Sequence, residues 1–292
     1  MRKTVNRDWR ASNQETKGEM MKIYNVLNLG AGVQSSTLAL MAVKGEIEKP
    51  DYAIFADTKW EPNQVYKWFK WLRPILEDAG IKVEVVENGD ISKTPENMQS
   101  GERWASLPYF IESNERKRSI SRRQCTSEYK IVPIERFIKR SIFKLKKGQR
   151  VPFKEIHLRQ WFGISLDEIT RMKVFQEKWR TAVYPLIDMR MKRSDCVAWC
   201  QRNGFPIPPR SACIGCPFHS DEEWRNLRDN HPEEFESACK FDEKLRIVTK
   251  GKLRGQPYLH RSCIPLRDAP IDYYDKDQLE LFDEDCTGYC GN

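Results

Sequence analysis

Two cysteines separated by two residues, Cys213 and Cys216, form the sharpest metal-binding signal in the sequence. This spacing lets both thiolates reach one metal ion or cluster. Cys125 follows a basic run, and nearby arginines would stabilise its thiolate. Three cysteines and a fourth ligand suit a [4Fe–4S] cluster. Zinc is the competing metal, and His219 could complete a Cys₃His site. We expect a metal centre here, with free thiols as the simpler alternative.

Five of the other six cysteines fall into two groups, and Cys263 has no evident partner. Cys286 and Cys290 stand near the C-terminus among glycines, and they suit a redox-active or persulfide-carrying pair, late cluster ligands, or thiols without a role. Cys196 and Cys200 lie one helical turn apart, and for them and for Cys239 burial in a core is a better explanation than ligation.

A glycine-containing turn follows the first apolar run, within YNVLNLGAGVQSSTLALMAV, residues 24–43. Small residues let the backbone approach a ligand, and the hydroxyl-rich helix start presents unpaired N–H groups. Phosphate or pyrophosphate can bind at such a place, although an ordinary strand-to-helix connection has the same pattern. The turn and helix start comprise Gly30, Ala31, Gly32, Gln34, Ser35, Ser36 and Thr37.

Charged side chains stand at two further points. Asp57 and Glu61 flank the end of a second apolar run and could bind Mg²⁺ or a nucleotide. Asp167, Glu168 and Arg171 form a second constellation, for which a capping pair with a salt bridge about one turn apart is the structural alternative.

Basic residues gather between Arg116 and Arg150, where only Glu128 and Glu135 are acidic. A concentration of one sign suggests an anionic partner, either a nucleotide or a nucleic acid. For residues 144–150 a solvated basic face is the better explanation.

Composition limits the class of protein. With 292 residues, 39% of them hydrophobic, and a net charge of +8, the chain can bury a sizeable core. It has no apolar run of about 18 residues, so we expect no membrane span. Residues 1–20 are polar and do not resemble a secretory signal. Nine cysteines in a sequence without such a signal favour a reducing, cytoplasmic setting.

The first half predicts alternating strands and helices. The first apolar run and residues 51–58 and 81–87 read as strands, while residues 63–80 place apolar side chains at helical spacing. This order predicts a parallel sheet with ligand sites at the carboxyl ends of its strands. The glycine turn and Asp57 would both lie at that edge.

Beyond residue 91 the predictions are less regular. Residues 92–127 are polar and basic and predict a flexible loop or lid. We expect a helix from Tyr129 to about Phe143 and, within residues 157–173, a fourth strand followed by a helix start with Ser165 as N-cap. Residues 181–187 predict a fifth strand, residues 193–204 a short helix, and residues 208–248 a knuckle and two helices.

In this order, the motifs resemble the PP-loop ATP pyrophosphatase superfamily, and within it the PAPS-reductase-like branch, over residues 22–292. GAGVQSS resembles the loop Ser-Gly-Gly-x-Asp-Ser: Gly32 and Ser35 match, whereas Gly30, Ala31 and Gln34 replace Ser, Gly and Asp. ADTKWEP is similar to Asp-Thr-Gly-x-Glu, with lysine in place of glycine. RRQCTSEYKIVPIERF, GISLDEITR and CIGCPF resemble further blocks of this branch.

The resemblance implies an α/β fold with a three-layer α/β/α core of the adenine nucleotide alpha hydrolase type. We expect a loose arm at residues 1–20, a nucleotide-binding domain at 21–205, and a small cysteine-bearing helical module at 206–292. ATP or an adenylyl-sulfate nucleotide would bind through Gly30, Ala31, Gly32, Gln34, Ser35, Ser36, Asp57, Thr58, Glu61, Arg122, Arg123 and Lys130. The implied reacting groups are Cys125, Cys286, Cys290, Asp167, Glu168 and Arg171.

Two sulfur chemistries follow from this resemblance. One is adenylation of tRNA or DNA followed by its thiolation, for which a thiol or a sulfur-donor protein would be a partner. The other is reduction of an adenylyl sulfate, although the Glu-Cys-Gly-Leu-His ending of the true reductases is absent. Gln34 in place of the loop's aspartate removes one group that could organise Mg²⁺ and weakens the expectation of pyrophosphate cleavage. The alternative is a non-catalytic nucleotide-binding or nucleic-acid-binding module with a structural zinc knuckle.

Overall fold

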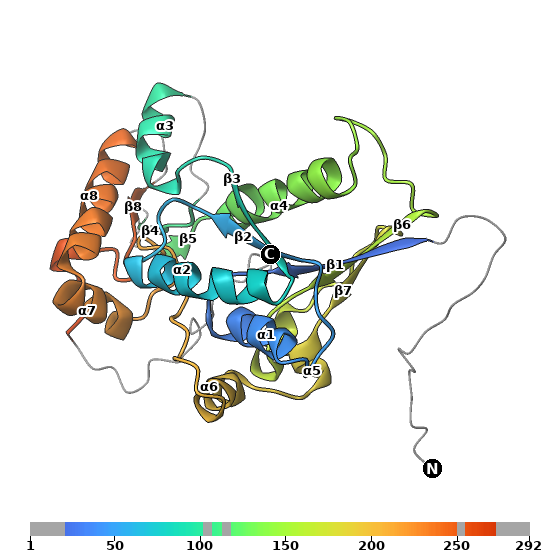
Figure 1. Ribbon diagram of the computed structural model, residues 1–292. Coiled ribbons are helices and arrows are strands. Elements are labelled where there is room, and N and C mark those ends of the chain that lie inside the picture. The colour runs from blue at the N-terminus through green and yellow to red at the C-terminus, as the bar shows by residue number, and fades with distance from the viewer. Residues whose placement is uncertain (1–20, 102–106, 113–117, 250–254, 273–292) are drawn as a thin grey trace, which may run out of the picture.

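A five-stranded parallel sheet forms the centre of the molecule (Figure 1). The computed structural model describes residues 21–101, 107–112, 118–249 and 255–272. The strand order is β3-β2-β1-β6-β7, and every neighbouring pair is parallel. The strands are β1 (Lys22–Asn28), β2 (Tyr52–Asp57), β3 (Lys82–Glu87), β6 (Ile156–Trp161) and β7 (Arg180–Val183). The predicted α/β class with a parallel sheet is confirmed.

Helices cover both faces of this sheet (Figure 1). One face packs against α1 (Val33–Val43), α2 (Asn63–Asp78), α5 (Pro185–Asp188) and α6 (Arg193–Arg202). On the other face lies α4 (Val132–Phe137), which continues from the π-helical η2 (Thr126–Ile131) into η3 (Ile138–Ile142). Helix α1 is buried on nearly all sides because it lies between the sheet, α2 and α6. The predicted burial of Cys196 and Cys200 on α6 is confirmed.

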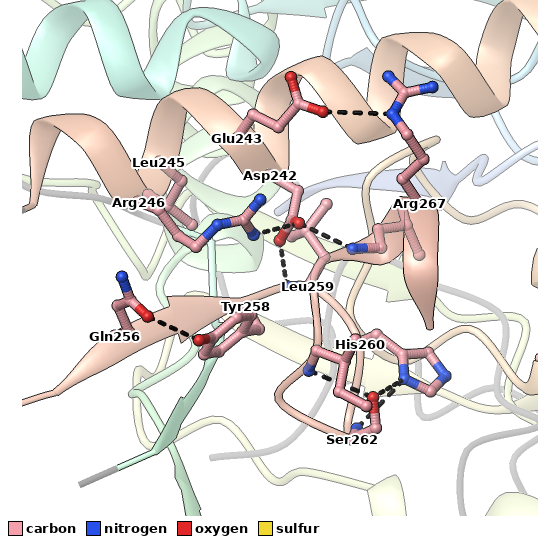
Figure 2. A network of polar contacts seen from close by, with 12 residues as sticks. Asp242, Glu243, Leu245, Arg246, Gln256, Tyr258, Leu259, His260, Ser262 and Arg267 are labelled. Atoms are coloured by element: carbon pink, nitrogen blue, oxygen red, sulfur yellow. Dashed lines mark hydrogen bonds and ion pairs between the residues drawn. The ribbon is translucent and has the colours of Figure 1, made fainter. Parts of the chain in front are cut away.

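A second apolar core lies beyond the carboxyl ends of the strands. It brings together η1 (Ile91–Lys93), α3 (Thr94–Ser100), α7 (Asp221–Asn230), α8 (Pro232–Val248) and η5 (Leu266–Asp268). Beside them β4 (Phe110–Glu112) pairs with both β5 (Arg118–Ile120) and β8 (Gln256–Tyr258) in a short antiparallel sheet. Asp242 of α8 holds the chain that follows this helix: its carboxylate accepts the Leu259 N–H and pairs with Arg246 (Figure 2). It also accepts the Leu266 N–H.

The described part of residues 92–127, predicted to form a flexible loop or lid, has more regular structure than expected, and its role as a lid stays a prediction. It contains α3 and two short strands because sparse apolar residues, among them Met98 and Tyr109, are buried against helices α7 and α8. Their partners follow more than a hundred residues later, so no local periodicity reveals the contact. This second core contains residues from both sides of residue 205. The predicted domain division at that residue stays a prediction.

Two predicted elements end earlier than expected. Strand β7 stops at Val183 because Pro185, which lacks an N–H to donate to a neighbouring strand, begins α5. The helix start after Ser165 is only the 3₁₀ turn η4 (Leu166–Arg171), and Ser165 does not cap it with its side chain. The other predicted strands and helices are present within a few residues of their expected positions.

None of the helices among the described residues is long and apolar enough to cross a membrane.

Candidate functional site

The glycine turn lies at the carboxyl end of β1, where it leads into α1. Ala31 has a left-handed φ of 54°, and the Gly30 N–H donates to Ser35 Oγ over 3.1 Å. Regular helical bonding begins with the Ser36 N–H, which donates to the Gly32 carbonyl over 3.0 Å. Within the described part of the chain, the N–H groups of Gly32, Gln34 and Ser35 have no acceptor. These amides stand at the positive end of α1, where an anion is favoured.

The side chains of the first helical turn are used for packing. Gln34 Nε2 donates to Ser165 Oγ over 3.3 Å, and Ser36 Oγ accepts the Trp68 Nε1–H over 2.9 Å. Thr37 Oγ1 donates to the Val33 carbonyl over 2.8 Å. All three side chains are buried. The turn therefore offers an anion its backbone amides more than its side-chain groups.

Gly163, just after β6, packs closely against the backbone of the glycine turn at Ser35. A Cβ atom at this position would lie 2.6 Å from the Ser35 amide nitrogen and 2.8 Å from its Cα. No side chain fits there without a shift of backbone. The sequence gave no signal that Gly163 contacts the start of α1.

A buried carboxylate, Glu61, joins three segments at the end of β2. Its Oε1 accepts the Thr58 hydroxyl over 3.1 Å, lies 3.4 Å from Lys130 Nζ of η2, and accepts the Cys213 thiol over 3.5 Å. The Glu61 side chain is fully buried and the Lys130 side chain is 7% exposed. Glu61 Oε2 has no hydrogen-bond partner in the described structure. Four residues predicted to act in binding or in the metal centre thus meet here.

Asp57 shapes the loop that leads to Glu61. Its Oδ1 accepts the Lys59 N–H and the Tyr66 hydroxyl, both over 2.8 Å, and its Oδ2 lies 3.1 Å from Lys59 Nζ. Burial, together with the bond to Asp57, raises the pKa of Tyr66. Lys59 has φ 63°, a left-handed conformation that glycine adopts more readily, and it occupies the position where the resemblance has glycine.

The basic residues predicted for this edge differ in exposure. Lys130 is buried in the contact with Glu61, whereas Arg122 is exposed. The Arg123 guanidinium stacks over the Phe218 ring, 5.0 Å from its centroid. The segment before Cys125 therefore packs against the segment after Cys216.

The Cys213–Cys216 turn packs against the loop that follows β2. The Cys216 N–H donates to the Cys213 carbonyl over 3.0 Å, and the Ile214 N–H donates to the Trp60 carbonyl over 2.9 Å. Gly215 lies flat on the indole, because a Cβ there would be 2.1 Å from a Trp60 ring carbon. This contact explains the glycine between the two cysteines.

The three predicted metal-binding cysteines do not form a ligand set as placed. The Cys213 thiol is directed at Glu61, and within the described ranges no group of three or more His, Cys, Asp or Glu residues could hold a metal ion. Cys286 and Cys290 lie outside the described residues.

His219 supports the cysteine turn through its ring. Its Nε2 lies 3.0 Å from the Cys213 carbonyl oxygen, which can only accept, so Nε2 carries the proton and donates. Nδ1 lies 3.6 Å from Glu223 Oε2, and Glu223 also pairs with Arg210. Burial and the charge of Arg210 lower the pKa of His219 to about 3. The ring is neutral and acts on the cysteine turn through a hydrogen bond.

This lowered pKa predicts a loss of stability in mild acid. Between the unfolded value near 6.5 and the folded value of about 3, the unfolded chain binds a proton that the folded chain does not, so stability is present above pH 6.5 and falls as the pH drops. His219 alone should contribute about 1.4 kcal/mol per pH unit well below pH 6.5. Urea unfolding at several pH values should show a shallower slope for His219→Gln than for the wild type. Equal slopes would contradict this assignment.

The second charged constellation also has a structural explanation. Both oxygens of Asp167 accept the N–H of Arg193, the first residue of α6, over 3.2 Å. Glu168 and Arg171 form a buried ion pair at 2.6 Å. Ser165, just before them, bonds to Gln34, so η4 is joined to the glycine turn.

Comparison with known proteins yields a limited result. A structure of phosphoadenylyl-sulfate (PAPS) reductase from Candida auris, as a phosphate complex, is similar with a TM-score of 0.39 and 12% sequence identity. The match covers 65% of this chain and 76% of that one. No protein-family model matches the sequence, and no curated protein matches it.

Proposed function

We propose that this chain is a nucleotide-dependent sulfur-handling enzyme of the PAPS-reductase-like kind, binding ATP or an adenylyl-sulfate nucleotide at residues 30–37. One observation carries the proposal: unbonded amides at the start of α1 and the Glu61–Lys130–Cys213 contacts both lie at the carboxyl ends of adjacent parallel strands. Ligands bind at such edges in open α/β sheets. Anion-binding amides and a thiol at one edge suit a phosphorylated substrate with a sulfur group.

The residues would divide the work by their chemistry. The amides of Gly32, Gln34 and Ser35 would hold phosphate oxygens, and the exposed Arg122 would neutralise phosphate or sulfate charge. Lys130 would keep the Glu61 carboxylate and the Cys213 thiol in one place. Because Lys59 contacts Asp57 Oδ2 and Lys130 contacts Glu61 Oε1, Mg²⁺ would compete with an ammonium group for these two oxygens, whereas Glu61 Oε2 has no partner in the described structure.

A metal centre at Cys125, Cys213 and Cys216 is a separate part of the proposal. Two features support it: the spacing of the last two cysteines, and the packing of the segment around Cys125 against theirs. Metal binding would require the Cys213 thiol to leave Glu61. A [4Fe–4S] cluster would supply electron transfer or a site for sulfide, whereas zinc would serve as a structural staple. We propose redox roles for the tail thiols Cys286 and Cys290 on sequence grounds alone.

Metal and product analysis tests these two parts separately. Protein purified without oxygen is assayed for iron, acid-labile sulfide and zinc. It is then incubated with ATP and a sulfide donor, with and without tRNA or DNA, or with an adenylyl sulfate and a dithiol that supplies the two electrons for its reduction. We expect AMP and pyrophosphate from ATP, or sulfite from the adenylyl sulfate. Absence of every product under all conditions would contradict the enzyme proposal, and colourless protein with stoichiometric zinc would contradict the cluster.

One observation favours a second candidate, a non-catalytic nucleotide-binding or nucleic-acid-binding module. Gln34, which stands where the resemblance has aspartate, is bonded to Ser165. The turn then keeps its anion-binding shape without the acid that could organise Mg²⁺. Nucleotide binding without turnover, together with zinc, would support this candidate.

A further inference from the structure

A segment rich in cations and without acidic residues extends from the end of η3 towards β6. Residues 140–154, RSIFKLKKGQRVPFK, include the basic side chains of Arg140, Lys144, Lys146, Lys147, Arg150 and Lys154, all of which are exposed. In the part of the chain that the structure describes, none of these six side chains forms an ion pair with an acidic group. Elsewhere, many surface cations of this protein do pair: Arg73, Lys244 and Arg267 are examples.

The backbone of this segment is fixed by apolar residues that alternate with the cations. Phe143 is buried and lies 5.4 Å from the Tyr24 ring and 5.9 Å from the Trp179 ring, measured between centroids. Leu145 is buried, and its N–H donates to the Lys139 carbonyl over 2.9 Å. Because Phe143 and Leu145 face the core, Lys144 and Lys146 remain on the solvent side. The charges are thus held on an anchored segment.

This segment, which we call the basic segment, lies far from the candidate site. It leads directly into the amino end of β6, whereas the glycine turn and Glu61 lie at the carboxyl ends of the strands (Figure 1). The nearby carboxylates of Glu135 and Glu177 are both paired with Arg180. Glu155 is the one acidic residue next to the segment in the sequence. The local charge is therefore strongly positive.

An exposed aromatic ring accompanies the cations. Phe153 is 45% exposed, and the Lys178 ammonium lies 5.7 Å from its ring centroid. Exposed rings next to cations provide stacking surface for unpaired bases, while the cations track a phosphate backbone.

We propose that the basic segment binds the sugar–phosphate backbone of nucleic acid. Charge complementarity identifies the partner, because unpaired cations gain most by replacing the counterions condensed on a polyanion. The proposal does not depend on the nucleotide site, because the basic segment lies at the amino ends of the strands and the glycine turn at their carboxyl ends. Nucleic acid would be held here whether or not it is also a substrate.

Salt-dependent binding of the full chain to a short DNA duplex and to a single-stranded RNA tests the proposal. For Lys146→Gln/Lys147→Gln, the slope of log K against log salt for the duplex should become shallower by about two, because each lost phosphate contact removes about one unit. Affinity should fall about tenfold or more at low salt. The matched control is Lys67→Gln/Lys70→Gln, which removes the same charge from exposed positions of α2.

Three results would overturn the proposal. One is an equal loss of affinity in the control variant. Another is the absence of binding by the wild type to either nucleic acid at about 50 mM salt. The third is binding to phosphatidylserine vesicles with none to DNA or RNA. Unchanged urea unfolding of both double variants would show that the comparison reports on binding and not on folding.

Discussion

Replacing Glu61 by alanine should lower the free energy of unfolding by about 3–5 kcal/mol, the usual cost of removing one partner from a buried ion pair. The Lys130 ammonium is almost entirely buried and lies 3.4 Å from Glu61 Oε1. Without this carboxylate, a buried positive charge loses a neutralising contact, and the Thr58 hydroxyl and Cys213 thiol each lose an acceptor. The loss should appear in urea unfolding near pH 7.

Two further variants separate charge from packing. Glu61→Gln keeps the shape and an acceptor for Thr58, so it isolates the loss of charge. The double variant Glu61→Gln/Lys130→Met removes both charges, and it should cost less than the sum of the single changes because the two side chains contact each other. Additive effects, or a cost below about 1 kcal/mol for alanine at residue 61, would place the pair among weak surface ion pairs and contradict its assignment.

Replacing Gly163 by alanine should weaken both folding and nucleotide binding. The new methyl group would lie 2.6 Å from the Ser35 amide nitrogen, so either the start of α1 or the chain after β6 must move. We expect a stability loss of about 1–3 kcal/mol from overpacking. Displacing one charge-assisted amide bond costs about 1.5–3 kcal/mol, which corresponds to roughly tenfold to hundredfold weaker nucleotide binding.

Gly204→Ala is the matched control for this experiment. Gly204 follows α6 with a left-handed φ of 72°, and a Cβ there would meet open space. Its replacement should cost about 1 kcal/mol through backbone strain alone and leave nucleotide affinity unchanged. Titration calorimetry with ATP, at a temperature where all variants are folded, makes the comparison. If Gly163→Ala binds ATP with wild-type affinity, the glycine turn is not part of the nucleotide-binding site.

The sheet was predictable from the sequence because its signals are local. Continuous apolar runs such as residues 51–58 mark strands buried on both faces, and the apolar spacing in residues 63–80 marks a helix. Alternation of the two predicts parallel strands, and this places the glycine turn and Asp57 at one edge. The structure bears out that placement.

Contacts between distant segments were not predictable. Glu61 and Cys213 are 152 residues apart, and nothing in either motif indicates a shared hydrogen bond. Gly215 reads as part of a metal knuckle, yet its contact with Trp60 gives it a packing role. Met98 has no periodic neighbours and is buried only because α8 covers it. Such positions are determined by tertiary packing, which local sequence patterns do not encode.

The most direct test of the proposed function is amide hydrogen exchange of the wild-type chain with and without ATP or an adenylyl sulfate. The N–H groups of Gly32, Gln34 and Ser35 have no acceptor in the described structure, so a bound phosphate should give them one and slow their exchange. We predict protection centred on residues 30–37, with smaller changes at residues 57–61. Saturating nucleotide that leaves residues 30–37 unprotected would contradict nucleotide binding at the glycine turn.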